Sequence, residues 1–242
     1  MSLSLHDTHF HLDLFERPQE ILGQIEKEKV YTVAVTNVPE IFEHTQALVK
    51  GSKYVKAALG FHPELANKHR TQIGKFLELL PQSRYIGEVG LDNYNKASSD
   101  YMIQKGIFEK IISACNAAQK KILTVHSRRA EKDVISIIGP EFSGKVILHW
   151  YSGSIKEIDK ALSYGFYFSV NYAMTQSENG RKIITHIPVN RILLETDGPF
   201  IKIGNQPSTP IVTKHILEEI ILLKRQENLP AIINENLRSI LS

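Results

Sequence analysis

Two histidines separated by one residue stand in the segment DTHFHLD at residues 7–13. In a strand, successive side chains alternate between the two faces, so His9 and His11 would project from the same face about 6.5 Å apart. Buried imidazoles are costly to desolvate without partners, and neutral histidine is the commonest protein ligand for divalent metals. The pair alone is more typical of two ordinary polar residues on a half-exposed strand, so the metal interpretation depends on the rest of the chain.

Elsewhere in the sequence, histidines and carboxylates recur at the C-terminal ends of apolar runs. The residues that stand at such ends are His9, His11, His62, Glu88, Asp92, His126, His149 and Asp197. Each alone is compatible with a satisfied core residue, but several strands that deliver imidazole or carboxylate to one place predict a metal site. We expect the other histidines to lie outside this site: His6, His44, His69, His186 and His215.

The predicted ligands form two groups that share a bridge. The groups are His9, His11 and Asp197 for one ion and His126 and His149 for a second, with Glu88 bridging both through its two oxygens. Two ions about 3.5–4 Å apart suit phosphate ester hydrolysis, because they lower the pKa of water from 15.7 towards about 7 and stabilise charge on phosphorus. A mixed histidine and carboxylate set accepts zinc, manganese or, less well, magnesium. We expect Asp197 also to orient the nucleophile and accept its proton.

These residues need a scaffold that brings distant segments together. Eight β-rich apolar runs begin about every 20 to 37 residues, the spacing of a strand plus a crossover. They cover residues 4–12, 30–38, 53–61, 84–91, 121–127, 145–151, 164–170 and 191–197. Apolar residues three and four apart predict helices over 19–28, 73–80, 101–119, 154–162 and, after the last strand, 213–228.

The runs are almost continuously apolar, as in parallel strands that are covered on both faces. Eight alternating units predict an α/β fold, a (β/α)8 TIM barrel that occupies residues 1–242 as a single domain. A doubly wound open sheet is the alternative. In a TIM barrel the C-terminal ends of the strands form the active-site face, and the metal-type residues fall at these ends.

The composition, 42% hydrophobic and 23% charged, is typical of a globular protein with a sizeable core. Cys115 is the single cysteine, which excludes an internal disulfide and a cysteine-based zinc site. The sequence shows neither a secretory signal nor the roughly 20 apolar residues of a membrane helix, so we predict no membrane partner and a cytoplasmic location. A net charge of +3 and the lack of an obvious aromatic strip do not favour strong DNA binding by the chain alone.

Six segments stand in order at the predicted strand ends: DTHFHLD, ALGFHPE, IGEVGLD, VHSRRA, LHWYSGS and LLETDGPF. Together they resemble the TatD family of metal-dependent deoxyribonucleases, within the amidohydrolase superfamily. The similarity runs from residue 7 to about residue 200. It implies a (β/α)8 barrel with two divalent ions and 3′-to-5′ exonuclease activity on DNA, and we predict DNA ends or single strands as substrate.

Taken position by position, the resemblance implies the same metal ligands as the strand ends do. It also implies that His62 lies near the metals and the substrate phosphate, in a catalytic and substrate-binding role. Arg128 would neutralise phosphate charge, unless it is a surface salt-bridge partner. Asp92 either orders the loop after the fourth strand or touches substrate, and Glu195 is expected behind the ligands or in a barrel layer.

Two loops depart from the family pattern and bear on substrate choice. In the first loop, IKIGNQPSTP, the only basic residue is Lys202, where the family usually has an arginine-bearing stretch. In the second, this chain has GLDNYNKASSD where the family has an aromatic-rich segment. Ser152 and Ser154 offer donors to phosphate or simply form a turn.

Two other functions stay open. One is an amide, lactone or phosphotriester hydrolase of the same superfamily. Many of those relatives bridge the metals with a modified lysine at strand four, whereas this chain has Glu88 and no lysine between Arg84 and Asn95. The other is a DNA-processing subunit that needs protein partners in a larger complex.

Overall fold

Eight parallel strands form the centre of the computed structural model, which describes residues 5–94 and 97–242. They are hydrogen-bonded in chain order: β1 (His6–Phe10), β2 (Tyr31–Ala34), β3 (Val55–Phe61), β4 (Tyr85–Gly90), β5 (Ile122–His126), β6 (Lys145–Leu148), β7 (Tyr167–Val170) and β8 (Ile192–Leu194). Main-chain bonds from Asp197 N to His9 O at 2.9 Å and from His11 N to Gly198 O at 3.0 Å join the end of β8 to β1. The predicted (β/α)8 barrel is therefore confirmed, while a single domain over 1–242 stays a prediction.

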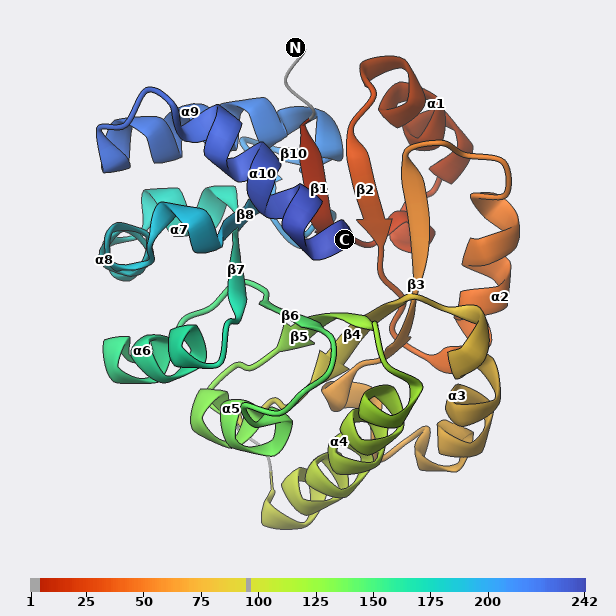
Figure 1. Cartoon of the computed structure of the whole chain (residues 1–242). Coiled ribbons are helices and arrows are strands. Elements are labelled where there is room, and N and C mark those ends of the chain that lie inside the picture. The colour runs from red at the N-terminus through yellow and green to blue at the C-terminus, as the bar shows by residue number, and fades with distance from the viewer. Residues whose placement is uncertain (1–4, 95–96) are drawn as a thin grey trace.

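Helices surround the strands (Figure 1). They are α1 (Pro18–Glu28), α2 (Pro39–Leu48), α3 (Ile73–Leu79), α4 (Ser98–Ala118), α5 (Glu131–Ile138), α6 (Ile155–Ser163), α7 (Tyr172–Gln176), α8 (Glu178–His186), α9 (Thr213–Lys224) and α10 (Leu229–Leu241). The helix predicted over 213–228 ends early, because Arg225 adopts the left-handed conformation at φ 53°. Within the described residues, no helix is both long and apolar enough to cross a membrane.

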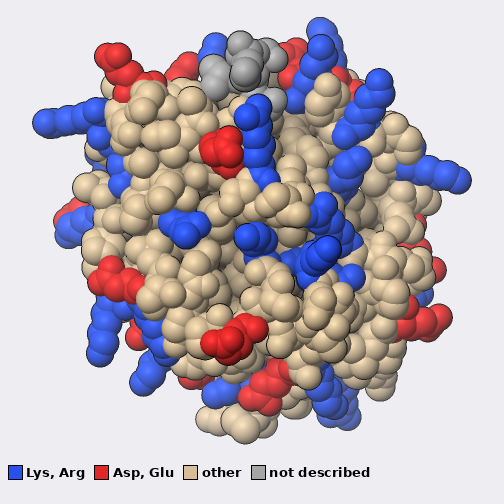
Figure 2. Space-filling view, in the orientation of Figure 1, with Lys and Arg blue, Asp and Glu red and all other residues tan. Residues whose placement is uncertain are grey.

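Helix α10 lies across the N-terminal ends of the strands. Its Ile240 belongs to the same apolar cluster as Ile122 and Leu193, and its Asn236 Nδ2 donates to the main-chain oxygen of Ile192 at 2.8 Å. Figure 1 shows α10 in front of the barrel, and Figure 2 shows basic and acidic side chains interspersed over this face. Since α10 covers the N-terminal ends, a site at the C-terminal ends of the strands faces the opposite side of the molecule.

Two glycines let β4 lie close to β5. A Cβ atom on Gly87 would lie 2.1 Å from Thr124 Cγ2, and one on Gly90, whose φ is +146°, would lie 2.0 Å from the main-chain oxygen of His126. Both distances are too short for any other residue without a shift. The close approach places Glu88 of β4 beside His126 of β5.

Candidate metal centre

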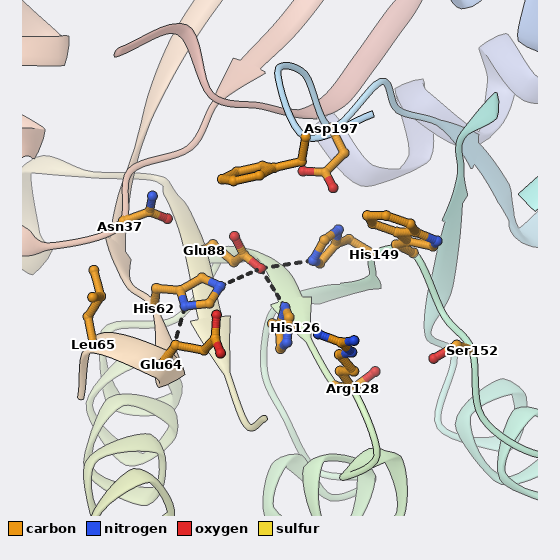
Figure 3. A pocket seen from close by; sticks show the side chains of 13 residues that line it. Asn37, His62, Glu64, Leu65, Glu88, His126, Arg128, His149, Ser152 and Asp197 are labelled. Atoms are coloured by element: carbon orange, nitrogen blue, oxygen red, sulfur yellow. Dashed lines mark hydrogen bonds and ion pairs between the residues drawn. The ribbon is translucent and has the colours of Figure 1, made fainter. Parts of the chain in front are cut away.

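The carboxylate of Glu88 lies at the centre of the candidate site (Figure 3). It is only 2% exposed. Its Oε1 atom lies 2.7 Å from His126 Nδ1, 2.9 Å from His149 Nε2 and 3.3 Å from His62 Nε2. Three strand ends, those of β3, β5 and β6, therefore bring imidazole nitrogen to one carboxylate oxygen.

The second oxygen of Glu88 contacts a different pair of rings. Oε2 lies 3.4 Å from His9 Nε2 and 3.3 Å from His11 Nε2, both at the end of β1. Asp197 completes this side, with its Oδ1 atom 3.7 Å from His9 Nε2 and 3.5 Å from His11 Nε2. His9, His11 and Asp197 present ligand atoms within 4.8 Å of one another, as do His9, Glu88 and His149.

Two of these nitrogens fit a bound cation. His9 Nε2 and His11 Nε2 are buried and have no hydrogen-bond partner, although both lie among carboxylate oxygens. Buried polar atoms are normally paired, so an unpaired nitrogen that faces carboxylates needs an explanation. A divalent metal ion supplies one, because imidazole nitrogen and carboxylate oxygen are both good ligands for it.

Neighbouring side chains orient the rings. The Thr124 hydroxyl lies 2.7 Å from His9 Nδ1, which leaves Nε2 to face Glu88. Asp92 Oδ2 lies 2.8 Å from His126 Nε2, and Asp92 Oδ1 also accepts a bond from Tyr94 N at 2.8 Å. Asp92 therefore holds both a site histidine and the loop after β4. Thr124 was not among the predicted site residues, although it lies two residues before His126 and so on the same face of β5.

Two further carboxylates are fully buried behind the site. Glu195 Oε1 accepts from Trp150 N at 3.0 Å and from Asn171 Nδ2 at 2.8 Å, and its Oε2 lies 3.7 Å from His149 Nδ1. This agrees with the expected position of Glu195 behind the ligands. Asp7, which the sequence analysis also missed, accepts bonds from the main-chain nitrogens of His9 and Thr196 at 3.1 and 3.0 Å. Asp7 thereby ties β1 to the segment that carries Asp197.

The electrostatics of the site favour positive charge on His11, His126 and His149, whereas burial lowers the pKa of His9. Burial opposes protonation of His11, but the nearby carboxylates of Asp197 and Glu88 outweigh it and raise the pKa of His11 to about 9. Burial opposes ionisation of Glu88, but His62, His149 and His9 outweigh it and hold the pKa of Glu88 well below its usual value. The carboxylates therefore stabilise cations here, and a metal ion would take the place of these protons.

His62 differs from the other rings. Its Nδ1 atom accepts a bond from Glu64 N at 3.2 Å, so a neutral ring carries its hydrogen on Nε2, which faces Glu88. In this tautomer His62 Nε2 donates a hydrogen bond, although His62, Glu88 and His126 also present ligand atoms within 4.8 Å of one another. His62 lies beside the candidate ligands, in a geometry that suits a hydrogen-bond donor.

A pocket of about 590 Å³ opens above this cluster. Its walls include Arg128 and Ser152, which Figure 3 places on the rim. The Arg128 guanidinium stacks 3.8 Å from the centre of the Tyr94 ring, which holds it at the pocket. Ser154 instead caps α6 by accepting from Glu157 N at 3.4 Å. Residues 95–96 of the divergent GLDNYNKASSD loop lie outside the described part of the chain.

The histidines expected outside the site are outside it. His6 is buried in the barrel wall, where its Nε2 accepts from Leu194 N at 3.1 Å. His186 pairs with Asp159 at 2.6 Å and His69 with Gln72 at 3.0 Å. Neither these histidines nor His44 and His215 line the pocket.

Known proteins resemble this chain over most of its length. It is 27% identical to a protein of Bacillus subtilis described as "Uncharacterized metal-dependent hydrolase YabD", over 96% of each chain. It is 28% identical to the "3'-5' ssDNA/RNA exonuclease TatD" of Edwardsiella piscicida, over 76% of this chain and 77% of that one. It is 27% identical to the human "3'-5' RNA nuclease TATDN2", over 91% of this chain and 32% of that one.

The fold and the family agree with these similarities. The crystal structure of YJJV, a TatD homolog from Escherichia coli, has a TM-score of 0.88 over 99% of this chain and 98% of that one, at 20% identity. The model of the family "TatD related DNase" matches residues 6–242. The chain therefore belongs to the family of TatD related DNases, which are metal-dependent hydrolases.

Proposed function

We propose that this protein hydrolyses phosphodiester bonds with two divalent metal ions, as a 3′-to-5′ exonuclease on DNA ends or single strands. The observation that carries the proposal is the position of Glu88, whose two oxygens face two different groups of imidazole nitrogens. A carboxylate in this position can bridge two ions. The names of the Edwardsiella and human relatives support a nuclease.

The proposed ligands are those of the two groups described above. They are His9, His11 and Asp197 on one side of Glu88 and His126 and His149 on the other. Zinc, manganese or magnesium bound there would stabilise charge on a phosphoryl group and activate water.

The protein's own residues bind the substrate and move the proton. Arg128, held on Tyr94 at the pocket wall, neutralises a phosphate oxygen with its fixed donors. His62 donates a hydrogen bond from Nε2 to a second phosphate oxygen, because Nδ1 already accepts a hydrogen bond from Glu64 N. Asp197, which is 3% exposed, accepts the proton of the attacking water.

Digestion of end-labelled nucleic acid tests the proposal. Metal-stripped protein is incubated with single-stranded DNA, duplex DNA and RNA, and magnesium, manganese or zinc is added back. We expect metal-dependent shortening from the 3′ end of DNA, and no turnover by the Glu88→Gln variant. Glu20→Gln, which changes an exposed glutamate of α1, serves as the matched control and should keep full activity.

The outcomes separate the alternatives. No cleavage of any nucleic acid, with hydrolysis of an amide, lactone or phosphotriester, would overturn the nuclease in favour of another reaction at the same site. Full activity of Glu88→Gln would overturn the role of Glu88. Metal content per chain, measured on the same samples, tests the number of ions. A protein partner in a larger DNA-processing complex and a cytoplasmic location stay predictions.

A further inference from the structure

Two large aromatic side chains line the pocket and remain in contact with solvent. Trp150 is 39% exposed and Phe200 is 59% exposed, and both belong to the pocket that contains Glu88. An aromatic ring that is left partly in water retains apolar surface whose burial against another flat ring is favourable. The pair therefore offers a surface for a planar group beside the metal centre.

The main chain and the site itself hold both residues in place. Trp150 directly follows His149, and its main-chain nitrogen donates to the buried Glu195 at 3.0 Å. Phe200 N donates to Asp197 O at 3.0 Å, and the Phe200 ring packs edge-to-face on His11 at 5.0 Å and 89°. The main chain of Trp150 and the ring of Phe200 are thus each held next to a candidate metal ligand.

The aromatic and the polar residues that line the pocket come from different segments of the barrel. Trp150 and Phe200 come from the segments after β6 and β8, whereas His62 and Arg128 come from those after β3 and β5. Glu88 of β4 lies at the base of the same pocket. Its volume of about 590 Å³ falls in the ordinary range for sites that bind small organic groups, about 300–1,000 Å³.

We propose that Trp150 and Phe200 stack on unpaired nucleobases next to the scissile phosphate and so make the protein select single-stranded ends. The inference rests on the proposed nuclease function. A base within a duplex is stacked and paired, whereas an unpaired base can lie against an aromatic side chain whatever its sequence. With Arg128 on the segment after the neighbouring strand β5, the base and the adjacent phosphate of one nucleotide can each contact a suitable side chain.

Intrinsic fluorescence tests the stacking without any need for turnover. Trp150 is the only tryptophan of the chain, so the emission reports on this one position. A short oligodeoxythymidylate with phosphorothioate linkages is titrated into metal-loaded protein. We expect saturable quenching, and none with an oligomer of the same length and charge that has abasic residues at its 3′ end. Emission that is unchanged by the thymidylate at saturation would overturn stacking on Trp150.

Steady-state kinetics test both residues. Trp150→Ala and Phe200→Ala should each raise KM for single-stranded DNA by about 5- to 140-fold, the range for loss of one stacked base. Trp150→Phe and Phe200→Tyr should stay near wild type because they keep a ring. With the 3′-abasic oligomer, wild type and both alanine variants should have equal KM. Leu222→Ala, which alters an exposed side chain of α9 that does not line the pocket, is the surface control.

The two proposals fail in different ways. Turnover of DNA with no quenching, and with KM unchanged in both alanine variants, would overturn the stacking and leave the nuclease. Saturable quenching without cleavage of any nucleic acid would support the stacking and overturn the nuclease. If the protein neither binds nor cleaves nucleic acid, both proposals are wrong.

Discussion

A histidine ring has two nitrogen atoms, and the partner of one decides what the other can do. His9 has Thr124 at Nδ1 and directs Nε2 at Glu88, as a metal ligand requires. His62 has a main-chain N–H at Nδ1 and must therefore donate from Nε2. Two histidines beside the same carboxylate thus have different chemistry, because their outer partners differ.

Removal of the Thr124 hydroxyl should weaken metal binding. Thr124→Val keeps the shape of this buried side chain but removes the partner of His9 Nδ1. Loss of such an outer partner typically reduces metal affinity about 10- to 100-fold. Calorimetric titration of metal-stripped protein with the metal ion should show this loss. Thr124→Ser should bind the metal as the wild type does. Equal affinity of the valine variant and the wild type would contradict this role.

At the scale of elements, the seam between β8 and β1 holds the site together. His6 accepts from Leu194 N at 3.1 Å, and the Thr8 hydroxyl donates to Leu194 O at 3.1 Å. Asp7 binds Thr196 one layer further toward the pocket. Each bond fixes β1 against β8, and together they set the spacing of His9, His11 and Asp197.

The buried His6 should make stability fall in acid. Burial lowers the pKa of His6 from 6.5 to about 3. Between these pH values the unfolded chain binds a proton that the folded chain does not, so the free energy of unfolding decreases as pH falls below 6.5. The decrease from this group should approach about 1.4 kcal/mol per pH unit.

Urea unfolding at several pH values between 7 and 4 measures this effect. His6→Gln keeps an acceptor for Leu194 N but does not titrate, so the difference in slope between wild type and variant isolates His6. Identical slopes for the two proteins would show that His6 does not contribute.

Helix α10 should stabilise the barrel without affecting its chemistry. Ile240 is 2% exposed and packs among residues at the starts of the strands. Ile240→Ala should reduce the free energy of unfolding by about 2–5 kcal/mol, through lost burial and the cavity that remains. Leu222→Ala, at a position that is 72% exposed, should change it by less than about 0.5 kcal/mol. Urea midpoints measure both, and metal affinity should be unchanged in both.

The strands were predictable from sequence because parallel strands buried on both faces are continuously apolar. Their ends then located His9, Glu88 and Asp197 without further information. Helices α2, α5, α7, α8 and α10 were not predicted from apolar spacing. For α10 a signal was present in Pro230, since proline is favoured in the first turn of a helix.

Contacts between distant segments were harder to predict. The bond between His9 and Thr124 joins residues 115 positions apart. The proximity of Trp150 and Phe200 in the pocket was not predicted, because the two residues lie in different segments and form no aromatic strip in the sequence. The pairing of Asp7 with Thr196 depends in the same way on how the barrel closes.

At the scale of the whole molecule, the candidate metal centre joins segments from five strands and should stabilise the folded chain. An ion that binds only the folded state at 100 times its Kd adds about 2.7 kcal/mol. For a chain of 242 residues this corresponds to a rise in Tm of about 5 to 10 °C per ion. Thermal unfolding with added metal or with a chelator should show the rise in wild type and in Glu20→Gln. Glu88→Gln should show a smaller rise, and an equal Tm of the wild type under both conditions would contradict the prediction.

The covering of one barrel end by α10 also affects how the protein can evolve. The ring of strands is closed and sealed at this end, whereas Trp150 and Phe200 lie on loops at the other, beyond the strands that carry them. Changes in these loops alter what enters the pocket while the strand pairing that maintains the fold stays intact. Substitutions at these two positions, in evolution or in a randomised library, can therefore change substrate choice without destabilising the barrel or altering the candidate metal ligands.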